Sequence, residues 1–146
     1  MFNFEKLIAY QETKKLVSNV YTLADKINAP EGDVVKKQIK KAVLEVPCAI
    51  AEGMSLATTN EKIVHLDAAY CNIARVYTML QMAVELNYIA AADLEAISEE
   101  MLEISKVVLG LKRKLKGDSF GSREDYSSRY DRTVDAIESA AADEEI

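Results

Sequence analysis

The side chains that could do acid–base or metal chemistry are few. The chain has one histidine, His65, and Glu61 lies four residues before it, so a helix would place both on one face. A metal site inside a helical bundle needs Glu-x-x-His pairs on two helices and further glutamates, a pattern this sequence lacks. We therefore interpret His65 as a surface or boundary residue paired with Glu61, and we expect no metal site.

A second candidate is Glu52, which lies in the apolar stretch AIAEG at 49–53. A buried carboxylate needs a partner, so we expect a structural salt bridge or cap, with Lys40, Lys41 or Arg75 as the partner. A general acid or base would need a second positioned group, which the sequence does not identify. It also has no glycine-rich phosphate loop and no GxSxG motif. We expect no catalytic residues and no cofactor.

Cysteine chemistry is not indicated either. Cys48 and Cys71 have apolar neighbours and no CxxC spacing, which favours two buried free thiols. The N-terminal residues MFNFEKL lack the layout of a signal peptide, and no run of about 18 apolar residues predicts a membrane-spanning helix. We expect a cytoplasmic protein with no membrane partner.

The charged residues suggest partners rather than chemistry. Two basic clusters could contact nucleic acid or a protein: Lys36, Lys37, Lys40 and Lys41, and then Lys112, Arg113, Lys114 and Lys116. Residues 117–146 hold nine acidic residues and three arginines, so they carry the whole net charge of −6 and leave 1–116 neutral. A neutral body has little long-range attraction for phosphates. Solvated lysine faces are the simpler interpretation, and nucleic-acid binding needs an oligomer that brings copies of the clusters together.

Four helices must position these residues. Their expected ranges are 4–27, 33–54, 59–87 and about 93–116. The third helix has the strictest apolar spacing, at Ile63, Leu66, Tyr70, Ile73, Tyr77, Leu80 and Val84. Thr59 or Asn60 suits its N-cap, and Asp93 suits that of the fourth helix. Pro47 predicts a kink in the second helix, which Gly53 helps to end.

The short links make consecutive helices antiparallel neighbours. The fold class is therefore all-α, an antiparallel up-down-up-down four-helix bundle over residues 1–116 with an acidic C-terminal tail over 117–146. We expect this tail to be mobile in isolation, to capture a partner through Tyr126 and Tyr130, and to form at most a short helix over 132–142.

The apolar residues exceed what one seam per helix requires. The additional ones are Leu16, Val20 and Leu23 on the first helix, Met79, Met82 and Leu86 on the third, and Leu102 and Leu109 on the fourth. Extra stripes on a bundle indicate a subunit interface, and a broad intramolecular core is the alternative. A non-catalytic, homo-oligomeric scaffold or interaction protein is the first functional hypothesis.

Several sequence motifs occur in the same order along the chain as in a known family. The sequence QIKKAVLEVPCAIAEG at 38–53 is similar to the pattern QLRRAAxSIPxNIAEG of the four-helix bundle family named for proteins encoded in 23S rRNA intervening sequences. The segment FEKLIAYQ at 4–11, the pair Val20–Tyr21, and LNYI at 86–89 beside the family's LGYL turn also fit. The resemblance covers about residues 4–116, and Pro47, Glu52 and Gly53 belong to its most specific motif.

The resemblance implies a homo-oligomer, typically a homopentamer, with no enzymatic activity. The accessory variability determinant of bacterial diversity-generating retroelements belongs to the same structural group and is a strongly basic partner of nucleic acid and a reverse transcriptase. An accessory protein of that kind is the alternative function. This chain departs from that branch, because its body is neutral, Lys40 and Lys41 replace the two arginines, and Ala49 replaces the asparagine.

Overall fold

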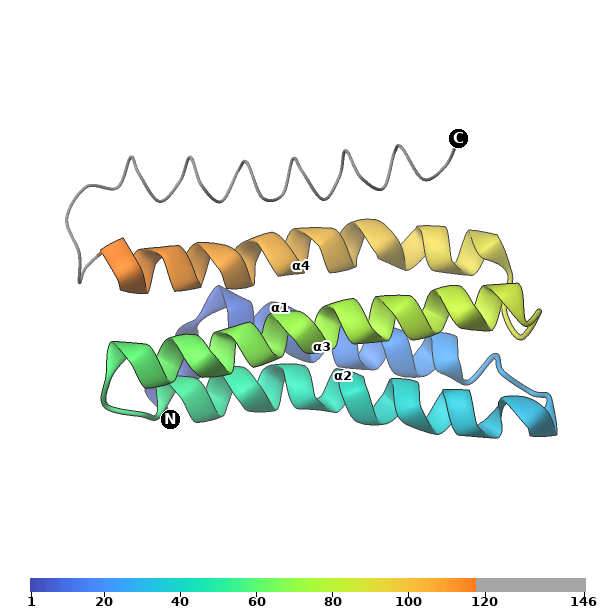
Figure 1. Ribbon diagram of the computed structural model, residues 1–146, viewed down its shortest axis with the longest axis horizontal. Coiled ribbons are helices and arrows are strands. Elements are labelled where there is room, and N and C mark those ends of the chain that lie inside the picture. Colours follow the sequence, from blue (N-terminus) through green and yellow to red (C-terminus); the bar gives the residue numbers. More distant parts are fainter. Residues whose placement is uncertain (118–146) are drawn as a thin grey trace.

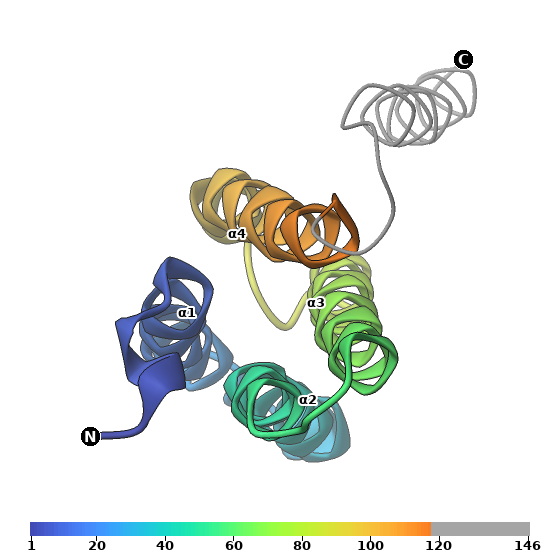
Figure 2. The same cartoon turned by 90° about the vertical axis from the view of Figure 1, so that its left-hand side faces the viewer.

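The computed structural model describes residues 1–117, and these form four α-helices. Their bounds are Ile8–Ala24 for α1, Asp33–Met54 for α2, Thr59–Glu85 for α3 and Ala91–Gly117 for α4. Two short 3-10 helices, Asn3–Lys6 (η1) and Pro30–Gly32 (η2), precede α1 and α2. Consecutive helices run in opposite directions (Figure 1), and the end-on view shows them around a common centre, with α1 beside α2 and α4 (Figure 2). The tail predicted over 117–146 lies outside the described residues beyond Gly117.

The first helix is shorter than expected. The sequence predicts one helix over 4–27, whereas the chain forms η1, changes direction at Leu7, whose backbone is extended, and then forms α1. The aromatic residues of this entry segment contact one another, because the Phe4 ring stacks on Phe2 and meets the Tyr10 ring edge-on. Ring packing thus fixes how the chain enters α1. The other three helices have nearly the predicted bounds, and α2 continues through Pro47.

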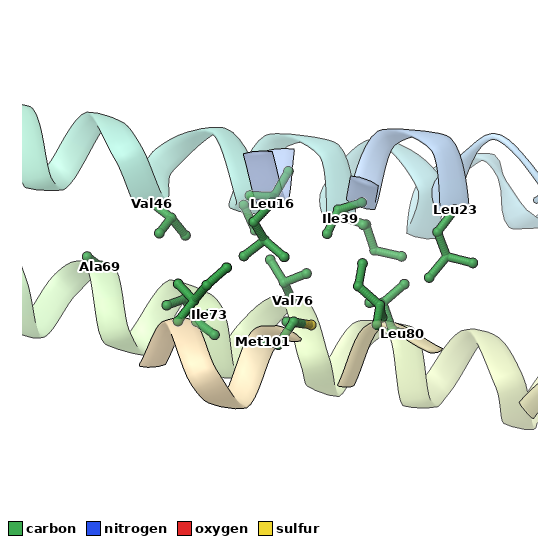
Figure 3. Close-up of a cluster of buried hydrophobic side chains, with 14 of the residues drawn as sticks. Leu16, Leu23, Ile39, Val46, Ala69, Ile73, Val76, Leu80 and Met101 are labelled. Carbon is green, nitrogen blue, oxygen red and sulfur yellow. The ribbon is translucent and has the colours of Figure 1, made fainter. Parts of the chain in front are cut away.

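The interior is apolar along its whole length. Figure 3 shows the middle of it, where Leu16 and Leu23 from α1, Ile39 and Val46 from α2, Ile73, Val76 and Leu80 from α3, and Met101 from α4 meet. Among residues 1–117 the only buried polar side chain is that of Thr13. Its hydroxyl donates to the Ala9 carbonyl 2.8 Å away, within its own helix. No titratable residue is buried in the described part.

α2 and α3 approach each other closely at Gly53. A Cβ atom placed on Gly53 would lie 2.6 Å from the Cβ of His65, which is closer than two carbon atoms can approach. A glycine is therefore required for the two helix backbones to come this near. This contact positions the start of α3, and with it His65, against the end of α2.

Capping residues fix the two ends of α3. The Thr58 hydroxyl accepts from the Glu61 N–H at 3.2 Å and the Glu61 carboxylate accepts from the Thr58 N–H at 3.4 Å, a capping box. The predicted caps, Thr59 and Asn60, are thus wrong by one or two residues. At the other end Asn87 has φ of 61°, and the following N–H of Tyr88 donates to the Ala83 carbonyl at 2.9 Å.

The fourth helix begins earlier than predicted. Asp93 lies in its first turn rather than at the N-cap, and its carboxylate accepts from the Ala90 N–H at 3.1 Å. Within residues 1–117, no helix is long and apolar enough to cross a membrane.

Candidate functional site

Glu52 is exposed, so the prediction of a buried carboxylate is wrong. Its side chain is 70% exposed, and its Oε2 atom lies 4.0 Å from Nε2 of His65. Two residues correspond to about 200° around a helix, so Glu52 points away from the core although Ile50 points into it. The expected partners are also wrong, because Lys40 contacts Asp25 instead and His65 is the neighbour of Glu52.

His65 lies at the boundary of the protein surface, as expected, but it does not pair with the Glu61 side chain. Its Nδ1 atom is 3.0 Å from the Glu61 backbone carbonyl, an arrangement in which Nδ1–H donates. The Glu61 carboxylate is occupied in the capping box. In residues 1–117, no three His, Cys, Asp or Glu side chains gather where they could share a metal ion.

Both cysteines are exposed, which contradicts the prediction of buried thiols. Cys48 and Cys71 are free and lie on the outer faces of α2 and α3. Each has buried residues two positions away, Val46 and Ile50 around Cys48 and Ile73 after Cys71. As at Glu52, apolar neighbours in sequence point to the opposite side of the helix.

Lysines of the α2 basic cluster contact acidic residues of the same protein. Lys40 donates to Asp25 at 2.6 Å, and Lys36 lies 3.8 Å from the same carboxylate. The Lys40 hydrogen bond lowers the pKa of the Asp25 carboxyl below its ordinary value of 3.8, and the charges of Lys40 and Lys36 act in the same direction. The Lys40 ammonium also lies 4.9 Å from the centre of the Tyr21 ring. These contacts join α2 to α1.

Two further α2 lysines are more exposed. Lys37 lies 3.0 Å from Asp33, one turn earlier on the same helix. Lys41 is exposed on the outer face. Of the predicted cluster, then, three lysines have an acidic neighbour within the described chain.

The basic cluster of α4 lies at the opposite end of the bundle (Figure 1). Lys112 donates to Asp67 of α3 at 2.6 Å, and its side chain is only 17% exposed. Lys114 is exposed, while Arg113 and Lys116 are half-buried. The two basic clusters therefore do not form one continuous surface on a single molecule. Lys40 of the first cluster links α2 to the end of α1, and Lys112 of the second links α4 to α3.

The extra apolar residues divide between core and surface. Leu16, Val20, Leu23 and Leu109 are buried, so for them the alternative of a broad intramolecular core is correct. Met79 packs half-buried against the core. Met82, Leu86 and Leu102 are 51%, 54% and 44% exposed, which leaves them available for contacts with another molecule.

The outward face of α3 carries a regularly spaced row of exposed residues. Six exposed residues follow one another at intervals of four and three, and we call them the α3 outer stripe: Val64, Ala68, Cys71, Arg75, Thr78 and Met82. One of these six residues is charged. Val64 is 64% exposed, a large fraction for a valine on a helix face. The sequence interpretation missed this stripe as a unit, although its spacing is the spacing of a coiled-coil seam.

Beside this stripe lies a hollow between α3 and α4, which we call the α3/α4 groove. Its volume is about 500 Å³. Tyr70, Ile73 and Tyr77 line it from α3, and Met101 and Leu102 from α4. Its lining is mainly apolar, so the groove suits a hydrophobic side chain better than a charged ligand.

Comparison with known proteins places the chain in a family. The model of the 23S rRNA-intervening sequence protein family matches residues 5–110, which is most of the chain and most of the bundle. The chain belongs to this family. No match is found among curated proteins.

A solved structure has the same fold. It is a protein of unknown function from the S23 ribosomal protein family of Bacteroides thetaiotaomicron VPI-5482, with a TM-score of 0.66 and 18% sequence identity. The alignment covers 72% of this chain and 98% of that one. At this identity the likeness shows the fold alone.

The structure explains two segments that resemble the intervening-sequence family. In the motif at 38–53, Gly53 allows α2 and α3 to approach, and Pro47 is buried inside α2. In the turn LNYI, Asn87 stands where the family pattern has glycine, and its positive φ is one that asparagine tolerates better than most residues. Gly53 and Asn87 therefore serve the fold. Of Pro47, Glu52 and Gly53, only Glu52 is exposed.

Proposed function

We propose that this intervening-sequence family protein is a non-catalytic scaffold that assembles copies of itself, and that the α3 outer stripe is the assembly surface. The observation that carries the proposal is the near absence of charge from that stripe. A solvated helix face is ordinarily polar or charged, whereas a face that packs against another protein loses its charged residues at the centre.

The spacing of the stripe supports the same conclusion. Intervals of four, three, four, three and four residues keep Val64 and Met82 on one line along the helix. A partner helix can follow such a line with continuous side-chain packing. Arg75, near the middle, is the one charged residue, and an arginine is well tolerated in interfaces.

We further propose that the assembly is a closed ring, with a homopentamer as the expected form. In a ring each copy uses two different surfaces, because head-to-tail contacts must close on themselves. The second surface needs apolar side chains on another helix. Val34 and Leu44 on α2, which are 70% and 44% exposed, meet this requirement.

The absence of catalysis is also part of the proposal. The only polar side chain buried in the described part belongs to Thr13, and the candidate acid Glu52 is exposed with a single imidazole neighbour. A carboxylate so open to water lacks the environment that tunes a general acid.

Mass determination in solution tests the scaffold proposal. Light scattering of the full 146-residue chain should give one defined species with a mass near a multiple of 16.2 kDa over a wide range of concentrations. A clean monomer at high concentration would contradict it.

A further inference from the structure

The α3/α4 groove has the form of a docking site for an apolar helix. Its floor consists of Ile73 and Met101, which are 4% and 2% exposed, while Leu102 on the rim is 44% exposed. The rings of Tyr70 and Tyr77 lie two helical turns apart along α3. The groove is therefore an elongated apolar surface between two helices, and part of it remains open to solvent.

Small side chains create this space. Ser98 and Ser105 line the α4 side and Ala74 the α3 side. The two hydroxyls donate to backbone carbonyls of their own helix, Ser98 to Glu95 at 2.9 Å and Ser105 to Leu102 at 2.6 Å. Because both donors are satisfied within α4, the hydroxyls do not need water, and an apolar partner can cover them at little cost.

The chain itself supplies a segment of matching pattern. Twenty-nine residues follow Gly117, and among them Tyr130, Val134, Ile137 and Ala141 are spaced by four, three and four. This spacing would put all four on one face of a helix, as in peptides that bind helically in grooves. Between them lie charged residues suited to the solvent side: Asp131, Arg132, Asp135 and Glu138.

The lengths allow this segment to reach the groove of its own copy. Ser105 lies twelve residues before Gly117, which is about 18 Å along the axis of α4. Residues 118–129 can span up to about 40 Å when extended. A helix over 130–141 would be about 18 Å long, enough to cover the groove.

Electrostatic attraction favours conformations in which the chain after Gly117 folds back along α4. The last turns of α4 carry four cationic residues, Lys112, Arg113, Lys114 and Lys116. The connecting residues carry three acids, Asp118, Glu124 and Asp125, and two arginines, Arg123 and Arg129. Residues 118–146 as a whole hold nine acidic residues and three arginines, a net charge of −6. Opposite charges on residues 118–146 and on the end of α4 lower the free energy of conformations in which the chain folds back over that helix.

We propose that residues 130–141 dock as an amphipathic helix in the α3/α4 groove of the same copy. In this arrangement the segment covers Leu102 and the two tyrosine rings, and its charged face points to solvent. The groove lining and the α3 outer stripe share no residue, so substitutions can disrupt docking and self-assembly separately.

Amide hydrogen exchange of the full-length chain, read by mass spectrometry, tests the docking. Exchange in 130–141 should be roughly tenfold or more slower than for an unprotected chain. Leu102→Asp should abolish this protection, because it puts a charge on the groove rim. Ile8→Asp on α1 is the control and should leave the protection intact, since Ile8 is exposed and does not line the groove. Far-UV circular dichroism should show that both variants keep the bundle.

A mixture of two full-length variants distinguishes docking in the same copy from docking in a neighbour. Ile137→Asp has an intact groove and a defective segment, while Leu102→Asp has the converse. After the two are refolded together, docking within one copy leaves both segments unprotected. Recovery of protection in the mixture would show docking between copies and overturn the proposal. Fast exchange in the wild type, or equal effects of Leu102→Asp and Ile8→Asp, would also overturn it.

Discussion

The outward faces of α3 and α4 differ although the two helices are otherwise alike. Each is 27 residues long, and each buries a row of apolar side chains in the same core. On α4 the positions equivalent to the α3 outer stripe form the α4 outer stripe: Ala92, Ala96, Glu99, Glu103, Lys106 and Gly110. Three of these six residues are charged, against one of six on α3.

The difference separates what the fold requires from what a partner requires. Both faces are remote from the core, so the fold constrains neither of them. The α4 outer stripe has the composition of a solvated surface, with Lys106 3.7 Å from Glu103. The α3 outer stripe exposes Val64 and Met82 instead. A function based on assembly explains why a stable bundle would keep apolar side chains on the α3 outer stripe.

The largest effects should come from the interior, where the two helices are equivalent. Ile73→Ala on α3 and Ile104→Ala on α4 each remove a buried side chain, so each should lower the free energy of unfolding by about 2–5 kcal/mol. Denaturant unfolding measures both. A loss below about 1 kcal/mol at either position would show that the helix is not an equal part of the core.

Two glycines should respond in opposite directions to the same substitution. Gly53→Ala would place a methyl group 2.6 Å from the Cβ of His65, so it should destabilise the protein by about 1–3 kcal/mol. Gly110→Ala on the α4 outer stripe meets nothing within 4 Å and should stabilise the helix by about 0.5–1 kcal/mol. Thermal melting of the two variants decides this, and a shift of the same sign in both would contradict it.

The smallest effect concerns the charged contacts of α4. Asp93 accepts from Lys26, in the turn after α1, at 2.7 Å. This hydrogen bond and that from the Ala90 N–H lower the pKa of Asp93 below its ordinary value of 3.8. A lowered folded-state pKa stabilises the protein above the unfolded-state pKa, and the gain is lost as the pH falls through the folded-state value. Asp93→Asn should therefore melt slightly lower than the wild type at pH 7.

Melting curves at several pH values check the sign. The difference in melting temperature between Asp93→Asn and the wild type should shrink as the pH falls below the ordinary carboxyl pKa of 3.8. The unfolded chain is protonated there first, and the folded carboxyl only at lower pH. A difference that stayed constant down to pH 2 would mean that the carboxylate charge is not its source.

The helices could be predicted from sequence because their inner seams are regular. The seam of α3 and the bounds of α2, Asp33–Met54, follow from apolar spacing and turn residues alone. Predictions about single residues failed where they relied on neighbours in the sequence. Glu52, Cys48 and Cys71 all have apolar neighbours and are all exposed, because two residues correspond to more than half a turn.

The candidate surfaces could not be predicted from the sequence, because they depend on how the helices are arranged in space. The excess apolar residues were recognised in the sequence, but whether Leu16 or Leu102 faces the core depends on which helices lie beside each one. The α3/α4 groove depends on small side chains from two helices at once, Ala74 on one and Ser98 and Ser105 on the other. Spacing within one helix does not reveal such a coincidence.

A matched pair of substitutions tests most directly whether the α3 outer stripe assembles the protein. Ala68 and Ala96 occupy equivalent exposed positions in the α3 and α4 outer stripes, and lysine is a good helix former at both. Sedimentation velocity of the full chain should show the same oligomer for the wild type and Ala96→Lys, and a shift to smaller species for Ala68→Lys. An unchanged oligomer in Ala68→Lys, or equal dissociation of both variants, would contradict assembly through α3.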